Sequence, residues 1–564
     1  MKFFYSSIFT FFAFATAANA QQLLRGPYQQ KKTKNSINIR WRTADSTNAT
    51  VYYGTSLNNL NLSVTDTTSL SDHDLELKNL QPFTKYYYKI ESGGNTLSGP
   101  DTAHWFRTAP VPGTVQPIRV WAVGDFGKGN QGQKDTRDAY LNYSKDKETD
   151  VWLWLGDNAY TDGTDQNYQD HVFEHNYAFG EIFKFMHFYP CPGNHDYNSV
   201  CGIPCQQDPN THKGPYYDII TVPSNGEAGG KPSSLENYYS YDYGNVHFIS
   251  LNSELGSPTA AFDWIGAYTN GATTSPMLQW LKDDLAQNTQ PWVIAYWHQP
   301  PYTKGSHDSD LFYELYMKAM RQNIGPILEQ YGVDLVVNGH SHAYERSFLL
   351  KGHTGLSSTF NPQQHLVNGT SGNEDIGEAY IKYTDGPTPN VGTVYVVTGN
   401  GGSDVDASKA GFYNGKAHPA MFYFDGGTNV CGSLVLDIDG NKLNGKYLSS
   451  TGAVKDKFTI VKQSVSSTKE VNSLANNIIE VKVMPNPFSK STTLTFTLSK
   501  PLNLNIQLFS IDGKTNRTLS NNHFADGQHS IEINSDQLHL SKGEYIVRIN
   551  EGKNASFERI LKIE

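Results

Sequence analysis

Five short polar motifs, each just beyond an apolar run, hold the residues of this chain best suited to chemistry. The apolar runs are typical of buried strands, and a glycine beside the polar residue lets the backbone turn sharply. The loops beyond the carboxyl ends of α/β strands converge, so motifs far apart in sequence can meet at one site. The motifs are Gly124-Asp125-Phe126-Gly127, Gly156-Asp157-Asn158-Ala159-Tyr160, Gly193-Asn194-His195-Asp196, His298 after the run Trp292–Trp297, and Gly339-His340-Ser341-His342.

The donor types in these motifs predict a site for two metal ions. Carboxylates, a phenol and an amide supply hard oxygen donors, and imidazoles supply borderline nitrogen donors. This mixture suits iron, zinc or manganese better than calcium, which prefers oxygen ligands. The expected metal ligands are Asp125, Asp157, Tyr160, Asn194, His298, His340 and His342.

An α/β core must position these motifs. Over residues 113–462 apolar runs such as Ile118–Val123 and Val151–Leu155 alternate with helical patterns. Ser275 followed by Pro276 predicts the start of one helix, because serine favours the N-cap and proline the first helical position. We therefore expect a multidomain chain whose α/β core has β-sheets sandwiched by helices.

The region in front of this core has the patterning of a β-sandwich. Residues 21–112 contain short runs in which polar and apolar residues alternate, separated by Gly, Asn and Ser turns. Within Leu80-Gln81-Pro82-Phe83-Thr84-Lys85-Tyr86 a tyrosine stands where a tyrosine corner would close a turn. The region resembles a fibronectin type III domain, and a β-domain of another type would carry the same functional implication.

Residues 1–20 predict an export signal. Lys2 precedes an apolar run that reaches Ala18, and Ala18-Asn19-Ala20 is a small-residue cleavage site. A membrane anchor, the alternative, fits less well because the run is short and contains Ser and Thr. No later stretch offers the roughly 18 apolar residues that a spanning helix needs, so we expect an exported, soluble protein.

Four cysteines allow three disulfide pairings. Export favours disulfides, and the glycine and proline between Cys201 and Cys205 favour that pair, which would leave Cys191 and Cys431 for a long-range pair. A cysteine metal site is the alternative, and the absence of any CxxC spacing argues against it.

Length and charge bound the class of protein. With 564 residues, 38% of them hydrophobic, the chain is too long for one core and should form roughly three to four domains. A formal net charge of −10 argues against nucleic-acid binding, which needs a basic surface to displace counterions from phosphates.

The motif order Asp, Asp-x-x-Tyr, Asn-His, His, His-x-His resembles the purple acid phosphatases within the calcineurin-like metallophosphoesterases. The tyrosine is the discriminating residue. Two more segments agree, His342-Ala343-Tyr344-Glu345-Arg346-Ser347 and Val394-Tyr395-Val396-Val397-Thr398-Gly399-Asn400-Gly401-Gly402, as does the β-domain in front. The resemblance covers residues 23 to about 460 and is nearest to the long, plant-type members.

The resemblance implies which ion each donor holds. The first ion would be Fe(III) and the second a divalent ion, Zn, Mn or Fe. Asp157 would bridge them, because a shared anion offsets the repulsion between cations roughly 3.5 Å apart. The first set is Asp125, Tyr160 and His342, and the second is Asn194, His298 and His340.

Two histidines would act outside the metal ligands. His195 and His307, together with Asn194, are implied to contact the substrate. Plant-type members carry a second histidine directly after the position of His307, whereas this chain has Asp308. Two interpretations stay open: Asp308 accepts a hydrogen bond from His307 and favours its charged form, or it faces solvent.

The implied activity is that of a secreted acid phosphatase, a metal-dependent phosphoric monoester hydrolase acting on small phosphorylated substrates. A metal-bound hydroxide would attack phosphorus in line, while protonated His195 and His307 stabilise charge and protonate the departing alkoxide, which favours a mildly acidic working range. A phosphodiesterase or a nucleotide pyrophosphatase would use the same centre. A non-catalytic surface-binding protein is less favoured, because all seven ligand positions are filled.

The end of the chain predicts a separate β-domain. Residues 463–477 lack aromatic residues and sustained periodicity, which indicates a linker, and residues 478–564 repeat the strand patterns of a small all-β sandwich. Met484-Pro485-Asn486-Pro487-Phe488 and Gly543-Glu544-Tyr545 resemble the C-terminal sorting domain of the type IX secretion system. That resemblance implies the secretion machinery as a partner, and a secreted or surface-attached protein. A carbohydrate- or surface-binding β module is the alternative.

Overall fold

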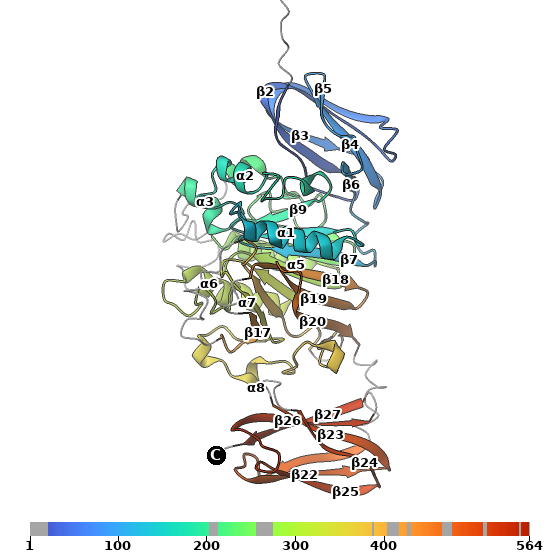
Figure 1. The fold of residues 1–564 in the computed structure, drawn as a ribbon, viewed down its shortest axis with the longest axis vertical. Helices are drawn as coiled ribbons and strands as arrows, with labels where there is room; N and C mark the ends of the chain where they lie inside the picture. Colours follow the sequence, from blue (N-terminus) through green and yellow to red (C-terminus); the bar gives the residue numbers. More distant parts are fainter. Residues whose placement is uncertain are drawn as a thin grey trace, which may run out of the picture. The chain divides into compact units, whose positions relative to one another are not determined.

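The computed structural model describes residues 21–201, 213–254, 275–385, 388–402, 417–425, 430–464, 477–510, 516–551 and 554–562. The chain forms two compact units, the first spanning Met1–Lys382 and Thr388–Lys462, and the second spanning Tyr383–Pro387 and Gln463–Glu564. Figure 1 traces both by colour along the sequence. The predicted export signal, Cys205 and most of the predicted linker lie outside the described residues.

The first unit begins with the expected β-domain. Its long strand β2 pairs with β1 through its first half and with β4 through its second half, while β3 runs beside it throughout. The predicted tyrosine corner is present, because the backbone N–H of Gln81 donates to the hydroxyl of Tyr86 at 3.0 Å. The strands are β1 (Leu23–Gln30), β2 (Ile37–Gly54), β3 (Leu62–Leu77), β4 (Lys85–Ser92), β5 (Asn95–Ser98) and β6 (Trp105–Arg107).

Two seven-stranded sheets, counted over the described residues, form the core of the first unit. The order in one sheet is β10 (Tyr239–Tyr243), β11 (Val246–Ser250), β12 (Trp292–Trp297), β13 (Leu335–Asn338), β16 (Val394–Thr398), β14 (Tyr344–Ser347) and β17 (Met421–Asp425). The order in the other is β15 (Tyr380–Tyr383), β20 (Val454–Gln463), β19 (Lys442–Ser449), β18 (Gly432–Asp439), β7 (Ile118–Val123), β8 (Val151–Leu155) and β9 (Phe188–Cys191). The runs β11-β12-β13-β16 and β7-β8-β9 are parallel, and every residue of their central strands is buried, as continuous apolar sequences require.

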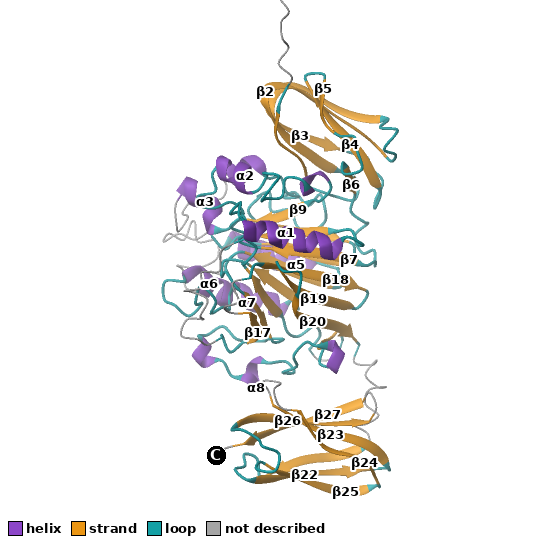
Figure 2. Ribbon diagram, viewed as in Figure 1, coloured by secondary structure: helices purple, strands orange, loops and turns teal. Residues whose placement is uncertain are grey.

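Alternation along the strands builds two cores. In β12, Ile294 and Tyr296 join the core between the two sheets, whereas Val293, Ala295 and Trp297 pack with helices on the outer face. On the other sheet, α1 lies against β18 and β19, as Figure 2 shows. The expected arrangement of sheets sandwiched by helices is confirmed.

The helices lie in the segments that connect the strands. The one predicted from sequence, α5 (Pro276–Gln287), starts directly after Ser275 and buries Met277, Leu278 and Leu281. The others are α1 (Gln131–Ser144), α2 (Asp165–His171), α3 (Asn194–Cys201), α4 (Pro215–Ile219), α6 (Leu315–Ala319), α7 (Gly325–Gln330) and α8 (Pro362–His365), with short turns η1 (Ile182–Lys184), η3 (Met320–Ile324), η4 (Ser357–Thr359) and η5 (Glu374–Ile376). Of these helices, α1, α5, α6 and α7 pack on the outer faces of the sheets.

The strand order rules out the long-range disulfide expected from the sequence. Cys191 and Cys431 are both buried and do not form a disulfide. Cys191 ends β9, and Cys431 directly precedes β18, with β8 and β7 between these strands. At about 4.8 Å per strand the two backbones are about 14 Å apart, whereas a disulfide needs Cα atoms within about 6.8 Å. The pairing of Cys201 with Cys205 involves a residue outside the described part of the chain.

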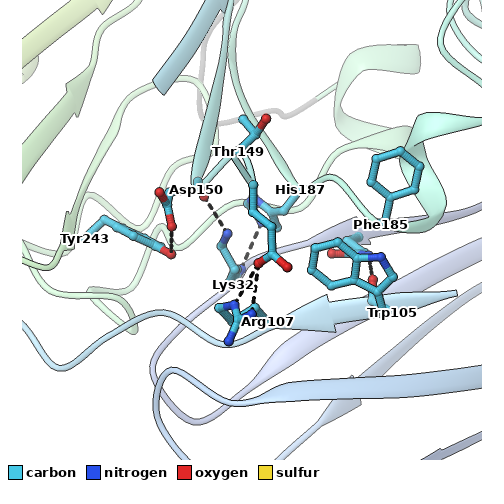
Figure 3. A pocket seen from close by; sticks show the side chains of 10 residues that line it. Lys32, Trp105, Arg107, Thr149, Asp150, Phe185, His187 and Tyr243 are labelled. Carbon is cyan, nitrogen blue, oxygen red and sulfur yellow. Dashed lines mark hydrogen bonds and ion pairs between the residues drawn. The ribbon is translucent and has the colours of Figure 1, made fainter. Parts of the chain in front are cut away.

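A small polar cavity lies where the β-domain meets the core of the first unit (Figure 3). Lys32 is buried there, and its Nζ donates to the backbone oxygen of Asp150 at 2.7 Å. The Asp150 carboxylate accepts from the Tyr243 hydroxyl at 2.9 Å, and Nε2 of His187 accepts from the backbone N–H of Lys32 at 3.0 Å. None of the predicted metal ligands lines this cavity, so it belongs to the domain junction.

The second unit is the expected small all-β sandwich. Its described strands form the sheets β21-β22-β25 and β24-β23-β26-β27, which enclose an apolar core that includes Leu494, Phe496 and Val547. The strands are β21 (Ile478–Met484), β22 (Ser491–Leu498), β23 (Leu502–Ser510), β24 (Asn516–Phe524), β25 (Gly527–Asn534), β26 (Gly543–Glu551) and β27 (Asn554–Lys562). Over all the described residues of the chain, no helix has both the length and the apolar character needed to cross a membrane.

Candidate metal centre

The loops beyond five parallel strands carry the seven predicted metal ligands. Asp125 lies two residues after β7, Asp157 two residues after β8, and Asn194 is the first residue of α3, soon after β9. On the other sheet His298 directly follows β12, and His340 lies two residues after β13. The carboxyl ends of the two parallel strand sets therefore face one shared site, as the sequence predicted.

The first group of donors surrounds the hydroxyl oxygen of Tyr160. This oxygen lies 3.0 Å from Oδ1 of Asp125, 2.9 Å from Oδ2 of Asp157 and 3.2 Å from Nε2 of His342. Nε2 of His342 is 3.4 Å from Oδ1 of Asp125. Four donor atoms thus come together from three separate loops.

The second group of donors centres on Nε2 of His298. This nitrogen lies 3.1 Å from Oδ1 of Asn194, 3.2 Å from Oδ1 of Asp157 and 3.2 Å from Nδ1 of His340. Nδ1 of His340 is also 3.1 Å from the same Asn194 oxygen. Asp157 is common to both groups, with Oδ2 toward the first and Oδ1 toward the second.

The spacing and chemistry of these donors fit two metal ions. Donor atoms that share one ion at about 2.1 Å are about 3 to 3.4 Å apart, as these are. Nδ1 of His298 lies 2.8 Å from the backbone oxygen of Leu155, so a neutral His298 carries its proton there and turns a lone pair of Nε2 toward Oδ1 of Asn194. In that tautomer both atoms are acceptors, and either a proton on Nε2 or a metal ion shared by the two atoms satisfies them.

The electrostatic field at the second group also favours a cation. Burial by itself lowers the pKa of the His298 imidazole, but the carboxylates of Asp157 and Asp125 raise that pKa to about 10. In the absence of a metal the field therefore retains a proton on His298. A metal ion bound to Nε2 would displace this proton, so metal binding should release protons.

The backbone is bent into the left-handed region at three donors. Asp125, Asp157 and His340 have φ values of 56°, 50° and 65°. Such a conformation costs about 1 kcal/mol or more for a residue other than glycine, and it persists where the surrounding structure enforces it. The preceding glycines allow the close approach, because a Cβ on Gly156 would lie 2.5 Å from Nδ1 of His298 and one on Gly339 would lie 2.5 Å from Oδ2 of Asp125.

The two outer histidines flank the donors and are partly exposed. The backbone N–H of His195 donates to Oδ1 of Asp157 at 2.8 Å, and its ring centroid is 4.5 Å from that of Tyr160. The ring of His307 stacks on that of His340 with centroids 4.0 Å apart. Their side chains are 25% and 36% exposed, whereas His298 is fully buried, so they lie on the solvent side of the donor cluster.

Comparison with known families agrees with this geometry. Residues 118–344 match the calcineurin-like phosphoesterases, and residues 28–108 match the N-terminal domain of purple acid phosphatases. The chain is thus similar to the purple acid phosphatases in its N-terminal β-domain and to the calcineurin-like phosphoesterases in its core. Residues 482–563 match a secretion system C-terminal sorting domain, which agrees with the resemblance of the second unit.

Known purple acid phosphatases share about a quarter of their matched residues with this chain. Purple acid phosphatase 15 of Arabidopsis thaliana is 28% identical over 299 residues, which are 49% of this chain and 49% of that protein. The purple acid phosphatase of Glycine max is 28% identical over 327 residues, 56% of this chain and 60% of its own length. The chain thus matches about half the length of these curated relatives.

Two solved structures show the same fold. A purple acid phosphatase from yellow lupin (Lupinus luteus) seeds aligns with a TM-score of 0.54 at 20% identity, covering 78% of this chain and 74% of that one. The structure of PhoD aligns with a TM-score of 0.51 at 11% identity, covering 88% and 91%. At these identities the likeness concerns the fold.

Asp308 departs from the plant-type purple acid phosphatases, and neither expectation for it describes the structure. Its carboxylate accepts from Nζ of Lys304 at 2.9 and 2.8 Å, and the residue is only 7% exposed, so it does not face solvent. Nδ1 of His307 lies instead 3.0 Å from Oε1 of Glu314. A cation four residues before Asp308 was the sequence signal for this pairing.

Asp196 is a buried residue of the site to which the sequence analysis gave no role. Its carboxylate accepts from the backbone N–H groups of Asn158 and Gly193 and from the hydroxyl of Tyr168, at 2.7 to 3.2 Å. It therefore ties the loop after β8 to the loop after β9. Burial and, to a smaller extent, the nearby Asp157 raise the pKa of Asp196 to about 6. Its place directly after Asn194-His195 was the available signal.

Proposed function

We propose that this chain is an exported acid phosphatase that hydrolyses phosphate monoesters at a dinuclear metal centre. The observation that carries the proposal is the pair of donor groups joined by Asp157, one oxygen of which belongs to each. Asp125, Tyr160 and His342 would hold Fe(III), and Asn194, His298 and His340 would hold a divalent ion, Zn, Mn or Fe. When bound, such a pair supplies an activated water at neutral pH and neutralises charge on the phosphate oxygens.

The other steps of the proposed reaction depend on side chains of the protein. Asp157 lies between the two sites and would offset the repulsion between the cations. His195 and His307, on the solvent side of the buried donors, would bind the phosphate and deliver a proton to the departing oxygen. Asn194 would orient the phosphate beside the second ion. Protonated histidines are required, so the activity should be greatest at mildly acidic pH.

The second unit would serve delivery and not chemistry. Its match to a sorting domain supports export through the type IX secretion machinery to the medium or the cell surface. We propose the following division of the chain: the signal is residues 1–20, the β-domain 21–112, the catalytic domain 113–462, the linker 463–477 and the sorting domain 478–564.

A metal analysis combined with a substrate panel tests the proposal. We expect two metal ions per chain, a visible absorption band in the iron-loaded oxidised protein, and faster turnover of monoesters than of diesters or nucleoside triphosphates between pH 4 and 8. A metal-replete protein that cleaves diesters or triphosphates but no monoester would replace the phosphatase by a phosphodiesterase or a pyrophosphatase. A metal-replete protein inactive on every ester would leave a surface-binding protein.

A further inference from the structure

A short segment at the solvent side of the donor cluster is closed by a histidine–carboxylate contact. His307 begins this segment and Glu314 ends it, with Nδ1 of the first 3.0 Å from Oε1 of the second. The Glu314 side chain is 12% exposed, so its contact with His307 is largely shielded from solvent. His307 in turn stacks on His340, and single ligand atoms of these three residues all lie within 4.8 Å of one another.

Glu314 lies at the start of a helix but does not cap it. It is the N-cap residue of α6, yet among the described residues its side chain makes no capping hydrogen bond to that helix. The carboxylate is directed to His307 instead. Glutamate is not among the residues that favour this position, so the side chain is free of a capping role.

Lys304 and Arg321 hold the segment between His307 and Glu314. Nζ of Lys304 contacts the carboxylates of Asp308 and Asp310 at 2.8 and 3.2 Å. Nη1 of the buried Arg321 donates to the backbone oxygen of Ser309 at 3.0 Å. These contacts anchor the segment independently of His307, so Glu314 can restrain the imidazole without itself depending on it.

We propose that Glu314 is a positioning residue for His307 and thereby suits the centre to phosphate monoesters of alcohols, whose alkoxide leaving groups need a proton. The inference rests on the proposed function. The carboxylate accepts from Nδ1–H and so fixes the tautomer and ring orientation, which reserves Nε2–H for the substrate. In the step itself the oxygen of a hydroxide ion forms a bond to phosphorus as the bond from phosphorus to the ester oxygen breaks, the proton on Nε2 moves to the ester oxygen, and His307 is left neutral with Nδ1–H still bonded to Glu314. Solvent then returns a proton to Nε2.

Two variants of Glu314 test whether its side chain acts by accepting a hydrogen bond from His307. Glu314→Ala removes the acceptor, and kcat for an alkyl monoester such as glycerol 2-phosphate should fall about 10–100-fold, the usual effect of losing a carboxylate behind a site histidine. An activated aryl ester such as 4-nitrophenyl phosphate should lose less than about threefold, because its leaving group departs without a proton. Glu314→Gln keeps an acceptor oxygen at the same place and should recover most of the alkyl activity.

A matched pair elsewhere in the chain provides the control. His175 and Glu181 form the same kind of contact, with Nδ1 of the histidine 2.6 Å from Oε1 of the glutamate, but both side chains are 58% exposed and neither touches a donor residue. Glu181→Ala should leave both kcat values unchanged. Combining Glu314→Ala with His307→Ala should cost no more than His307→Ala alone, because the two residues act as one unit.

A measurement without turnover tests the same contact. In metal-free protein with ¹⁵N-labelled histidine, a hydrogen-bonded Nδ1–H signal should be absent from His307→Ala and Glu314→Ala, and present in the Glu181→Ala control. This spectrum stands whether or not the protein proves to be a phosphatase, so failure of the proposed function and failure of the positioning role can be told apart.

Three results would overturn the role. Equal losses on the alkyl and aryl esters in Glu314→Ala would show that the residue merely supports the fold. Additive losses in the double variant would show that Glu314 acts independently of His307. A metal count reduced by one ion in Glu314→Ala would instead make His307, Glu314 and His340 ligands of a further cation.

Discussion

The donor cluster of the first unit and the sandwich of the second unit treat their polar residues in opposite ways. In the cluster, Nε2 of His298 and Oδ1 of Asn194 are buried face to face, and Asp157 adopts a left-handed backbone. In strand β22 of the sandwich, exposure alternates regularly, with Leu494 and Phe496 buried and partly exposed threonines between them. Local cost is tolerated in the first case because it prepares a binding site, whereas β22 follows the ordinary alternation of a strand that packs one face on a core.

The largest effect should come from removing a donor of the second group. Asn194→Ala or His298→Ala should lose the divalent ion and lower turnover by orders of magnitude, because both charges are needed at the phosphate. Metal content per chain and kcat measured on the purified variants check this. A variant with wild-type turnover and two ions would show that the contact between these buried acceptors has nothing to do with metal binding.

Removing the outer histidine beside Tyr160 should cost less. His195→Ala should keep both ions, since its ring is not in either donor group, and should reduce kcat for alkyl monoesters by about 10²-fold, as expected for the loss of a general acid. Steady-state rates on esters of graded leaving-group pKa measure the effect. Parallel losses on all esters would assign His195 to substrate binding alone.

Replacing the phenol should change colour more than rate. Tyr160→Phe removes the atom at the centre of the first donor group, so a visible charge-transfer band of iron-loaded, oxidised protein should disappear, while part of the activity remains because the phenol does not touch phosphorus. Absorption spectra of wild type and variant at matched iron content show whether the band is lost. A band that persists in the variant would exclude Tyr160 from the ligands.

A buried charged triad away from the donors should affect stability and not catalysis. His247 lies 2.8 Å from carboxylate oxygens of Asp242 and Asp284. Burial lowers its pKa, but the two carboxylates raise it to about 9, above the unfolded value of 6.5. The resulting stability, about 3 kcal/mol, is therefore complete below pH 6.5 and is lost as the pH rises through 9.

Thermal unfolding between pH 6 and pH 10 tests whether the stability contributed by His247 falls as the pH rises. The excess stability of wild type over His247→Gln should shrink as the pH rises. The difference between the two proteins is the relevant quantity, because Lys32 and Lys382, whose pKa values burial lowers to about 8, titrate in the same window in both. A difference that stays constant with pH would mean that His247 is neutral in the folded protein.

The smallest effect on catalysis should come from the largest deletion. Removing residues 478–564 should leave kcat of recombinant protein within about twofold of wild type, because the donor residues lie outside the second unit, and separate domains fold on their own cores. Export by the native cell should be lost. Cell fractionation of full-length and truncated protein tests the sorting role, which a normally exported truncation would disprove.

The sequence was sufficient for the donor cluster because its signals are local. Gly156 before Asp157 marks the backbone bend and the proposed ligand, and the apolar run before it marks a strand whose end faces the donor cluster. Helix α5 was predictable for the same reason, from Ser275 and Pro276. Where a residue's position follows from its own neighbours in the chain, the structure agrees with the prediction.

Roles that depend on spatial neighbours were missed or misjudged. The distance between Cys191 and Cys431 depends on strand order, which no local pattern encodes. Glu314 lies seven residues after His307, which along a regular helix or strand is about 10 Å or more, so nothing in the sequence predicts that the two side chains touch. Asp308 was considered as the partner of His307 because it is adjacent in sequence, but its carboxylate contacts Lys304.

The division of the Asp157 carboxylate between two donor groups has a consequence for how the proposed centre would fill. One ligand in common makes the two ions thermodynamically linked, and linkage is reciprocal: the factor by which the first ion changes the affinity for the second is the factor by which the second changes the affinity for the first. The first ion would orient the shared carboxylate and also add a positive charge beside the empty site. If the first ion raises the affinity for the second, limiting metal would leave a few chains with two ions each. If it lowers that affinity, limiting metal would leave many chains with one ion each.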